Sequence, residues 1–251
     1  MRRFYLPPHE CQPDRLALTG GEARHAAEVL RIRIGDAAAI LDGEGREFIC
    51  RVGKVEKKRV ELEILQTDVS PAPACAVTLI QAIPKGKIFE SIIHKATELG
   101  VLRIIPLLSE RVTTHLSGES LERKTERWRQ TAIEAIKQCG QRWLPMVEPP
   151  IPLPSLIARA DKYDLALFGA LQSGALHPRD YFQNYEQSHC WSPTSIAVWI
   201  GPEGDFSPGE ADAIGKSGAN PITLGPLILR SETAALYTLS IINYELSSPT
   251  A

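Results

Sequence analysis

From residue 75 onward, short apolar runs alternate with segments that have the spacing of amphipathic helices, and this alternation limits the possible folds more than any other feature of the chain. Residues 76–83, 101–108, 163–168 and 196–200 are almost continuously apolar, as is typical of strands buried on both faces. Helices are predicted over residues 87–99, 119–139, 207–217 and 231–246, and a further short strand over 222–224. We therefore expect an α/β domain over residues 75–251, with a parallel sheet covered on both faces.

The first 65 residues follow another pattern, in which short apolar runs are separated by glycine-containing turns. Strands are predicted over residues 38–41, 47–55 and 59–65, with a short helix over 21–31. The segment 68–74 carries Pro71 and Pro73, and proline lacks the backbone donor that a helix or a central strand needs. We place a domain boundary there, after a small β-rich barrel over residues 1–70.

Composition excludes several classes of protein. With 43% hydrophobic residues and a formal net charge of −2, the chain is neither disordered nor collagen-like. No run approaches the roughly 20 apolar residues of a membrane-spanning helix, and the opening residues lack the apolar run of a signal peptide. The five cysteines are far apart, without the two-residue spacing of zinc or redox pairs. We expect a cytoplasmic protein with no membrane partner and no metal site.

Charge is distributed unevenly along the chain. Residues 1–60 carry 12 basic and 9 acidic side chains and residues 81–145 carry 11 and 7, whereas residues 146–251 carry 5 and 11. Phosphate neutralisation requires lysine and arginine on one surface, so the front of the chain could hold nucleic acid. A solvated charged face explains the same counts equally well.

Three segments that follow predicted strands are candidate ligand sites, because ligands of parallel sheets bind beyond the carboxyl ends of the strands. One is the short segment 167–170, and the other two are longer loops. In the first loop, Gly201 and Gly204 would let backbone approach a ligand, and Ser207 with Glu210 forms a capping box that starts a helix. An ordinary turn between a strand and a helix remains the alternative. The segment has neither the Gly-Lys-Ser/Thr of a P-loop nor a dinucleotide fingerprint, which disfavours phosphate cradling.

The second loop runs from Leu224 through an apolar stretch into Arg230-Ser231-Glu232-Thr233. Ser231 or Thr233 can cap the last helix, and Arg230 and Glu232 are expected to face the opening of the same ligand site. A cation and a carboxylate beside an apolar loop cost desolvation free energy unless they pair with each other or with a substrate. A helix start stabilised by an ion pair is therefore the alternative to a functional site.

These two loops resemble the signature loops of the RsmE family, which comprises bacterial 16S ribosomal RNA methyltransferases of the SPOUT class that act on N3 of a uridine. Further similar segments lie throughout the chain, at residues 95–101, 105–106, 111, 127–128, 134–135, 138 and 142, and near the front at 2–5, 25 and 29–31. The chain departs from the family pattern at Asp205, where glycine is usual, at Pro226-Leu227, where a basic residue is common, and at Ser231, where threonine is common.

The resemblance implies a C-terminal trefoil-knot domain that binds S-adenosylmethionine mainly through backbone groups, after an N-terminal PUA-like barrel. It places the cofactor among Leu167, Phe168, Gly169, Ile200, Gly201, Pro202, Gly204, Leu224, Gly225, Leu227, Ile228, Leu229, Thr233 and Ala234. It also implies a homodimer, for which the last helix offers a packing face, although that face could equally serve the core of one chain.

For methyl transfer, Arg230 is the candidate electrostatic stabiliser, and Glu232 either orients it or takes the proton from N3. The expected partner is 16S ribosomal RNA or the small ribosomal subunit. Candidate RNA contacts are Arg2, Arg3, His25, Arg31, Arg33, Lys87 and Arg111. The competing hypotheses are a catalytically silent RNA-binding protein of the same fold and a nucleotide-dependent enzyme that uses the same edge of the sheet.

Overall fold

The structure is a computed structural model that describes residues 1–12, 15–86, 88–111, 119–170 and 174–247. The chain divides into two compact units. The first comprises Met1–Ala72 with Ile133–Leu144, and the second comprises Pro73–Ala132 with Pro145–Ala251. The helix α3 (Glu119–Cys139) thus supplies residues to both units.

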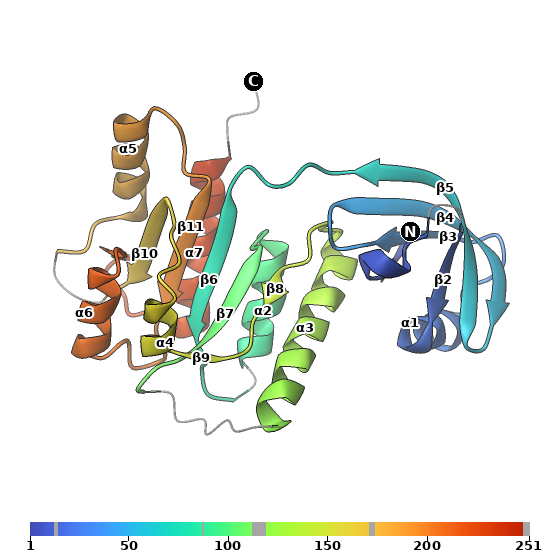
Figure 1. The fold of residues 1–251 in the computed structure, drawn as a ribbon, viewed down its shortest axis with the longest axis horizontal. Helices are drawn as coiled ribbons and strands as arrows, with labels where there is room; N and C mark the ends of the chain where they lie inside the picture. Colours follow the sequence, from blue (N-terminus) through green and yellow to red (C-terminus); the bar gives the residue numbers. More distant parts are fainter. Residues whose placement is uncertain (13–14, 87, 112–118, 171–173, 248–251) are drawn as a thin grey trace. The chain divides into compact units, whose positions relative to one another are not determined.

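The first unit contains a five-stranded sheet (Figure 1). Its strands are β1 (Arg2–Tyr5), β2 (Arg15–Thr19), β3 (Ala37–Leu41), β4 (Arg46–Glu56) and β5 (Arg59–Val69), paired in the order β1-β3-β4-β5-β2. Only the β1/β3 pair is parallel. The short helices η1 (Pro8–Glu10), α1 (Gly20–Arg24) and η2 (His25–Val29) complete the unit. Phe4, Leu18, Ile40 and Val60 are fully buried in its core.

Two elements of this unit differ from the sequence prediction. The strand predicted over 59–65 continues to Val69, because β4 pairs with it as far as Arg46 opposite Val69 after an irregularity in register. The helix predicted over 21–31 is interrupted, since α1 gives way at His25 to the π-helical turn η2. The turn ends before Arg31, whose φ of 49° is incompatible with a right-handed helix.

The second unit contains a parallel sheet in the order β12-β10-β11-β6-β7-β8, with β9 also paired to β7. Its strands are β6 (Ala76–Ala82), β7 (Arg103–Leu108), β8 (Met146–Val147), β9 (Ile151–Pro152), β10 (Leu165–Gly169), β11 (Ser195–Ile200) and β12 (Asn220–Ile222). Its helices, besides the first part of α3, are α2 (Ile88–Glu98), α4 (Leu153–Ala158), α5 (Pro178–His189), α6 (Pro208–Lys216) and α7 (Ser231–Leu246).

Helices cover both faces of this sheet (Figure 1). On one face Ile105, Phe168 and Trp199 pack against apolar residues of α4 and α6. On the other, α7 packs against β11 and against α2. The predicted mixed α/β fold, with a β-rich first part and a parallel sheet in the second, is confirmed.

The predicted helices over 119–139 and 231–246 match α3 and α7 in both bounds. The prediction missed α5, which is polar along its length and buries only Pro178 and Phe182, so no apolar stripe marked it. All five cysteines are free thiols. In the part of the chain that the structure describes, no helix is both long and apolar enough to cross a membrane.

Candidate functional site

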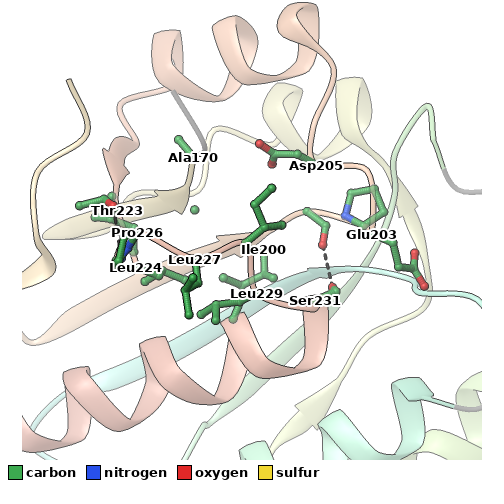
Figure 2. A pocket seen from close by; sticks show the side chains of 17 residues that line it. Ala170, Ile200, Glu203, Asp205, Thr223, Leu224, Pro226, Leu227, Leu229 and Ser231 are labelled. Carbon is green, nitrogen blue, oxygen red and sulfur yellow. Dashed lines mark hydrogen bonds between the residues drawn. The ribbon is translucent and has the colours of Figure 1, made fainter. Parts of the chain in front are cut away.

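Strands β10, β11 and β12 run parallel and end at one edge of the sheet, and a pocket lies beyond their carboxyl ends. Its volume is about 290 Å³. Most of its lining comes from three segments: the end of β10, a first loop (residues 201–207) between β11 and α6, and a second loop (residues 223–230) between β12 and α7. Figure 2 shows the lining side chains, which are Gly169, Ala170, Ile200, Gly201, Pro202, Glu203, Asp205, Ile222, Thr223, Leu224, Gly225, Pro226, Leu227, Ile228, Leu229, Ser231 and Ala234.

The first loop is anchored at its far end by the start of α6. The Ser207 side chain accepts a hydrogen bond from the Glu210 backbone N–H at 3.2 Å, and Glu210 accepts one from the Ser207 N–H at 2.9 Å, which confirms the predicted capping box. The other oxygen of Glu210 accepts from the backbone N–H of Glu110 at 2.8 Å. Because Glu210 is only 3% exposed, these bonds give its buried carboxylate the partners it requires and fix the loop's exit.

Arg111 holds the same loop from its outer side. Its guanidinium donates to the carbonyl oxygen of Gly204 and, at 3.3 Å, to that of Asp205. A Cβ on Gly204 would lie 3.5 Å from Cδ of Arg111, so Gly204 faces this arginine and is not part of the pocket lining. Arg111 is a candidate RNA contact from the sequence, and the structure shows that it also braces the loop.

Backbone geometry inside the first loop is tight. Asp205 adopts a left-handed φ of 62°, a conformation that favours glycine, and this explains why glycine suits the position. Its Oδ1 accepts from the Phe206 N–H at 2.8 Å. A Cβ on Gly201 would lie 3.1 Å from both of these atoms, which is closer than usual, so a side chain at Gly201 would require the turn to shift.

The second loop is held where it leaves the sheet. The Tyr181 hydroxyl on α5 donates to the Pro221 carbonyl of β12 at 2.9 Å, and burial raises the pKa of this phenol, which keeps it protonated as a donor. The Ala170 N–H donates to the Ile222 carbonyl at 3.1 Å, which joins the end of β10 to that of β12. Farther along, Leu227 and Ile228 are 74% and 80% exposed, so the loop presents apolar side chains to solvent.

Ser231 joins the two loops. Its hydroxyl donates to the Gly201 carbonyl at 2.7 Å (Figure 2). The same hydroxyl accepts from the Gln81 side-chain amide at 2.9 Å. Gln81, at the end of β6, is fully buried and also donates to the Ala82 carbonyl at 3.0 Å. The prediction that Ser231 or Thr233 caps α7 is wrong, because the N-cap is Arg230 and no side chain caps this helix. Ser231 is instead committed to the bridge across the pocket floor.

The lining is chemically distinctive. Among the described lining residues there is no lysine, arginine or histidine, and the only charged side chains are the carboxylates of Glu203 and Asp205. Apolar side chains and backbone N–H and C=O groups make up most of the rest. Such a pocket suits an apolar ring system with a cationic group and does not suit a phosphate. No group of three or more His, Cys, Asp or Glu within the described residues could hold a metal ion.

Of the fourteen residues predicted to bind a cofactor, ten line the pocket and four do not. The side chains of Leu167 and Phe168 are buried in the sheet, Gly204 faces Arg111, and Thr233 is exposed on α7. Arg230 and Glu232 are not lining residues either, although they flank Ser231. Both lie at the start of α7, directly before and after the lining residue Ser231 in the sequence.

Seven lining residues were not among the predicted cofactor contacts, namely Ala170, Glu203, Asp205, Ile222, Thr223, Pro226 and Ser231. Sequence signals for some of them were present. Ala170 ends the segment 167–170 that follows a predicted strand, Glu203 lies between the two glycines of the first loop, and Asp205 lies between Gly204 and the helix cap. The structure adds the pairing of β10 with β12, which no local pattern reveals.

The candidate RNA contacts of the first unit are not equivalent. The Arg2 guanidinium lies 3.5 Å from the Asp36 carboxylate, which also accepts a hydrogen bond from the Arg33 backbone N–H at 2.9 Å. Arg31 is exposed and His25 is half-buried.

Arg3 does not belong to an open surface. It is half-buried, with its guanidinium packed against Gly140 and 3.6 Å from Glu47, all within the first unit. Lys87 lies outside the described residues.

Two family models match the chain. The RNA methyltransferase domain matches residues 70–243, and the RNA methyltransferase PUA domain matches residues 18–65. Curated relatives named ribosomal RNA small subunit methyltransferase E include one from Aquifex aeolicus, 31% identical over 96% of this chain and 99% of the relative. Another, from Bacillus subtilis, is 28% identical over 98% and 97%.

Solved structures are similar over the same length. A methyltransferase from Legionella pneumophila, described in complex with the bound cofactor SAM, has a TM-score of 0.87 and 32% identity, with 96% of both chains covered. A ribosomal RNA small subunit methyltransferase E from Neisseria gonorrhoeae, bound to S-adenosyl methionine, has a TM-score of 0.84 and 29% identity, with 97% of both chains covered.

Proposed function

This chain belongs to the ribosomal RNA small subunit methyltransferase E family, and we propose that it methylates N3 of a uridine in 16S ribosomal RNA. It is an S-adenosylmethionine-dependent ribosomal RNA methyltransferase. The pocket between the two loops carries the methyl-donor part of the proposal, because it combines apolar walls, backbone polar groups and carboxylates with no basic side chain among its described lining residues. The N3 assignment rests on the resemblance of the two loops to those of the RsmE family.

The pocket fits S-adenosylmethionine by the chemistry of its donors and acceptors. The ligand combines a flat adenine, which suits apolar walls, with positive charge on sulfur, which suits Glu203 and Asp205. We infer that the residues that hold the ligand are those of the lining, rather than Leu167, Phe168, Gly204 and Thr233.

The chemistry requires a proton to leave the nucleophile. Bound S-adenosylmethionine supplies a methyl group whose carbon–sulfur bond breaks with its electron pair left on sulfur, while N3 of the uridine forms the new bond and loses its proton. Glu232 takes that proton or orients Arg230, and Arg230 stabilises the negative charge that develops on the base. Because N3 takes part in base pairing, the uridine must be unpaired or flipped out when it reacts.

The two roles can be separated by substitution. If Glu232 takes the proton, Glu232→Gln should lower the single-turnover methylation rate by about a hundredfold or more while cofactor affinity is unchanged. Raising the pH should partly restore this rate, because solvent can then remove the N3 proton. Arg230→Gln should be slowed at every pH, since charge stabilisation does not depend on that proton. A Glu232→Gln enzyme with the wild-type rate would exclude Glu232 as the base.

We propose that the exposed arginines of the first unit bind RNA, above all Arg31, together with Arg2 and Arg33, which both lie next to Asp36. Arg31→Gln should weaken RNA binding and reduce the salt dependence of the affinity by about one counterion, with cofactor affinity unchanged. Filter binding at several salt concentrations and calorimetry with cofactor measure the two effects. Lys216→Gln is the control, because it also removes one positive charge, from an exposed position on α6. Equal loss of both affinities in Arg31→Gln would mean that the residue is structural.

We propose that the active form is a homodimer. Leu227, Ile228, Tyr237 and Tyr244 are large apolar side chains between 45% and 80% exposed on the second loop and α7, and such surfaces usually meet a partner. A dimer over α7 would bury them beside the pocket. Light scattering that gave the 27.6 kDa mass of a single chain for the active enzyme would contradict this.

The function is tested most simply in cells. Nucleosides of 16S ribosomal RNA from a strain that lacks this protein, and from the same strain supplied with it, are compared by mass spectrometry. The proposal predicts one 3-methyluridine that depends on the protein. A protein-dependent methyl group on another atom would keep the enzyme class but overturn the N3 assignment, and identical RNA in both strains would overturn the proposed function.

A further inference from the structure

Gln81 is a fully buried polar side chain in the largely apolar strand β6. Its Nε2 donates to Ser231 Oγ at 2.9 Å and to the Ala82 carbonyl at 3.0 Å, whereas its Oε1 has no hydrogen-bond partner among the described residues. A buried amide with an unpaired oxygen lowers stability, and an apolar side chain of the same size would not carry that penalty. The presence of glutamine here is therefore a reason to ask what its amide group does.

The amide nitrogen decides where the Ser231 hydroxyl points. The Ala82 carbonyl lies next to the same amide atom, which requires that atom to be the nitrogen, because two oxygens would repel each other. An NH₂ group donates hydrogen bonds and does not accept them. Ser231 Oγ therefore accepts from Gln81, and the single hydroxyl proton is left for the Gly201 carbonyl, 2.7 Å away. The hydrogen bonds run in one direction, from Gln81 through Ser231 to Gly201.

This chain of hydrogen bonds ends on a peptide unit of the pocket. Gly201 and Pro202 are both lining residues. Because proline has no N–H, the Gly201 carbonyl oxygen is the only polar group of the peptide unit between them. A hydrogen bond to that oxygen fixes the plane of the peptide, and with it the start of the first loop. Gln81 itself is not a lining residue, and it pairs in the sheet with Ile200, the residue before Gly201.

We propose that Gln81 is a positioning residue for the methyl donor, because its amide directs the Ser231 hydroxyl to Gly201 and holds the first loop in the conformation that binds S-adenosylmethionine. The inference rests on the proposed function only in that this cofactor is the ligand. Glutamine suits the role because its NH₂ group supplies two donors and no charge, whereas a carboxylate of the same shape would accept from Ser231. The hydroxyl would then turn away from Gly201, and cofactor affinity would fall with no lining residue changed.

The test is Gln81→Glu, which keeps the shape of the side chain and replaces the two donors with a titratable group. When ionised, the new carboxyl group accepts from Ser231 and repels the Ala82 carbonyl, and when protonated it has one proton to donate. Burial raises the pKa of such a group, so it should titrate between about pH 5 and about pH 8. Calorimetry with the full chain should show that the affinity for S-adenosylmethionine, relative to the wild type, falls about tenfold or more over this range.

The wild-type profile removes the contribution of the other charged groups. Those that follow β6, flank Ser231 or line the pocket are Lys85, Arg230, Glu232, Glu203 and Asp205. All are present in both proteins, so the ratio of the two affinities reports the new carboxyl group. Gln187→Glu is the matched control, because it adds the same group at an exposed position on α5, and its profile should follow that of the wild type.

Two further variants separate positioning from a general effect of a buried charge. In the Ser231→Ala protein there is no hydroxyl to direct, so adding Gln81→Glu should change the cofactor affinity by less than about twofold across the pH range. Gln81→Met buries no charge and leaves the hydroxyl undirected, so it should lose about three- to tenfold in affinity at every pH. Thermal unfolding at each pH shows which variants are folded.

Three results would overturn the inference. They are a folded Gln81→Glu protein with the wild-type pH profile, a pH-dependent loss of affinity that persists without the Ser231 hydroxyl, and a Gln81→Met protein with wild-type affinity. The last of these applies even where the glutamate variant does not fold. Failure of the wild-type chain to bind the donor at all would instead overturn the proposed function.

Discussion

Gly201→Val should reduce the affinity for S-adenosylmethionine by about a hundredfold, equal to about 2.8 kcal/mol of binding free energy. A Cβ at this position would lie 3.1 Å from Oδ1 of Asp205 and from the Phe206 backbone nitrogen, and 3.3 Å from the Asp205 carbonyl carbon. Backbone atoms cannot move aside as the end of a flexible side chain can. The first loop must therefore shift, and with it the backbone groups that line the pocket. Calorimetry measures the affinity.

The control is Gly215→Val, on α6, where an added Cβ would meet nothing within 4 Å. That variant should bind the cofactor as the wild type does. Thermal unfolding of both variants distinguishes a local shift from loss of the fold. A folded Gly201→Val protein with wild-type affinity would show that the cofactor is not held by this turn.

Ser231→Ala should lower both the free energy of unfolding and the cofactor affinity, because the hydroxyl is the one group that bridges Gln81 and the Gly201 carbonyl. Ser231 is 4% exposed and Gln81 is fully buried, so water does not readily replace the lost partner. A buried polar group left without a partner costs about 1–3 kcal/mol. The side-chain amide oxygen of Gln81 already has no hydrogen-bond partner among the described residues, so the site has few other polar groups that could replace the lost bond. Urea unfolding and calorimetry measure the two effects.

Ser231→Thr is the matched comparison, because it keeps the hydroxyl and adds only a methyl group. It should retain most of the stability and affinity that the alanine variant loses. If both substitutions had equal effects, packing at this position and not the hydrogen-bonded bridge would be what matters. If neither had an effect, the two loops would not depend on the bridge.

The parts of the fold that could be predicted are those in which local pattern and tertiary environment agree. The bounds of α3 and α7 and the capping box of α6 follow from apolar spacing and from Ser207 and Glu210. Helix α5 has no such stripe, because it buries only two residues and leaves the rest half-buried or exposed. The end of β5 depends on how far β4 pairs with it, which is a long-range property.

The candidate site divides in the same way. The two loops were predictable because glycines and a helix cap follow apolar strands, and parallel strands bring their carboxyl ends to one edge. The role of Ser231 was not, because its partners Gln81 and Gly201 are 150 and 30 residues away in the sequence. Arg111 shows the same limit. Its position after a strand made it a candidate RNA contact, and only the fold reveals its bonds to the Gly204 and Asp205 carbonyls.

The departure at Asp205 also acquires a physical meaning from the structure. From sequence alone it stands out only as an aspartate where glycine is usual, with no indication of its effect on the loop. The left-handed φ of 62° explains the preference for glycine, and the pocket lining shows where the added carboxylate lies. Neither property is visible in local periodicity.

The central claim is that two glycine-containing loops, separated in the chain by α6 and β12, form one pocket for the methyl donor. A crystal structure of this protein with S-adenosylmethionine tests it most directly. We predict ligand density between residues 201–205 and 223–229. Density for the ligand elsewhere, with this pocket closed by its own apolar side chains, would contradict the account.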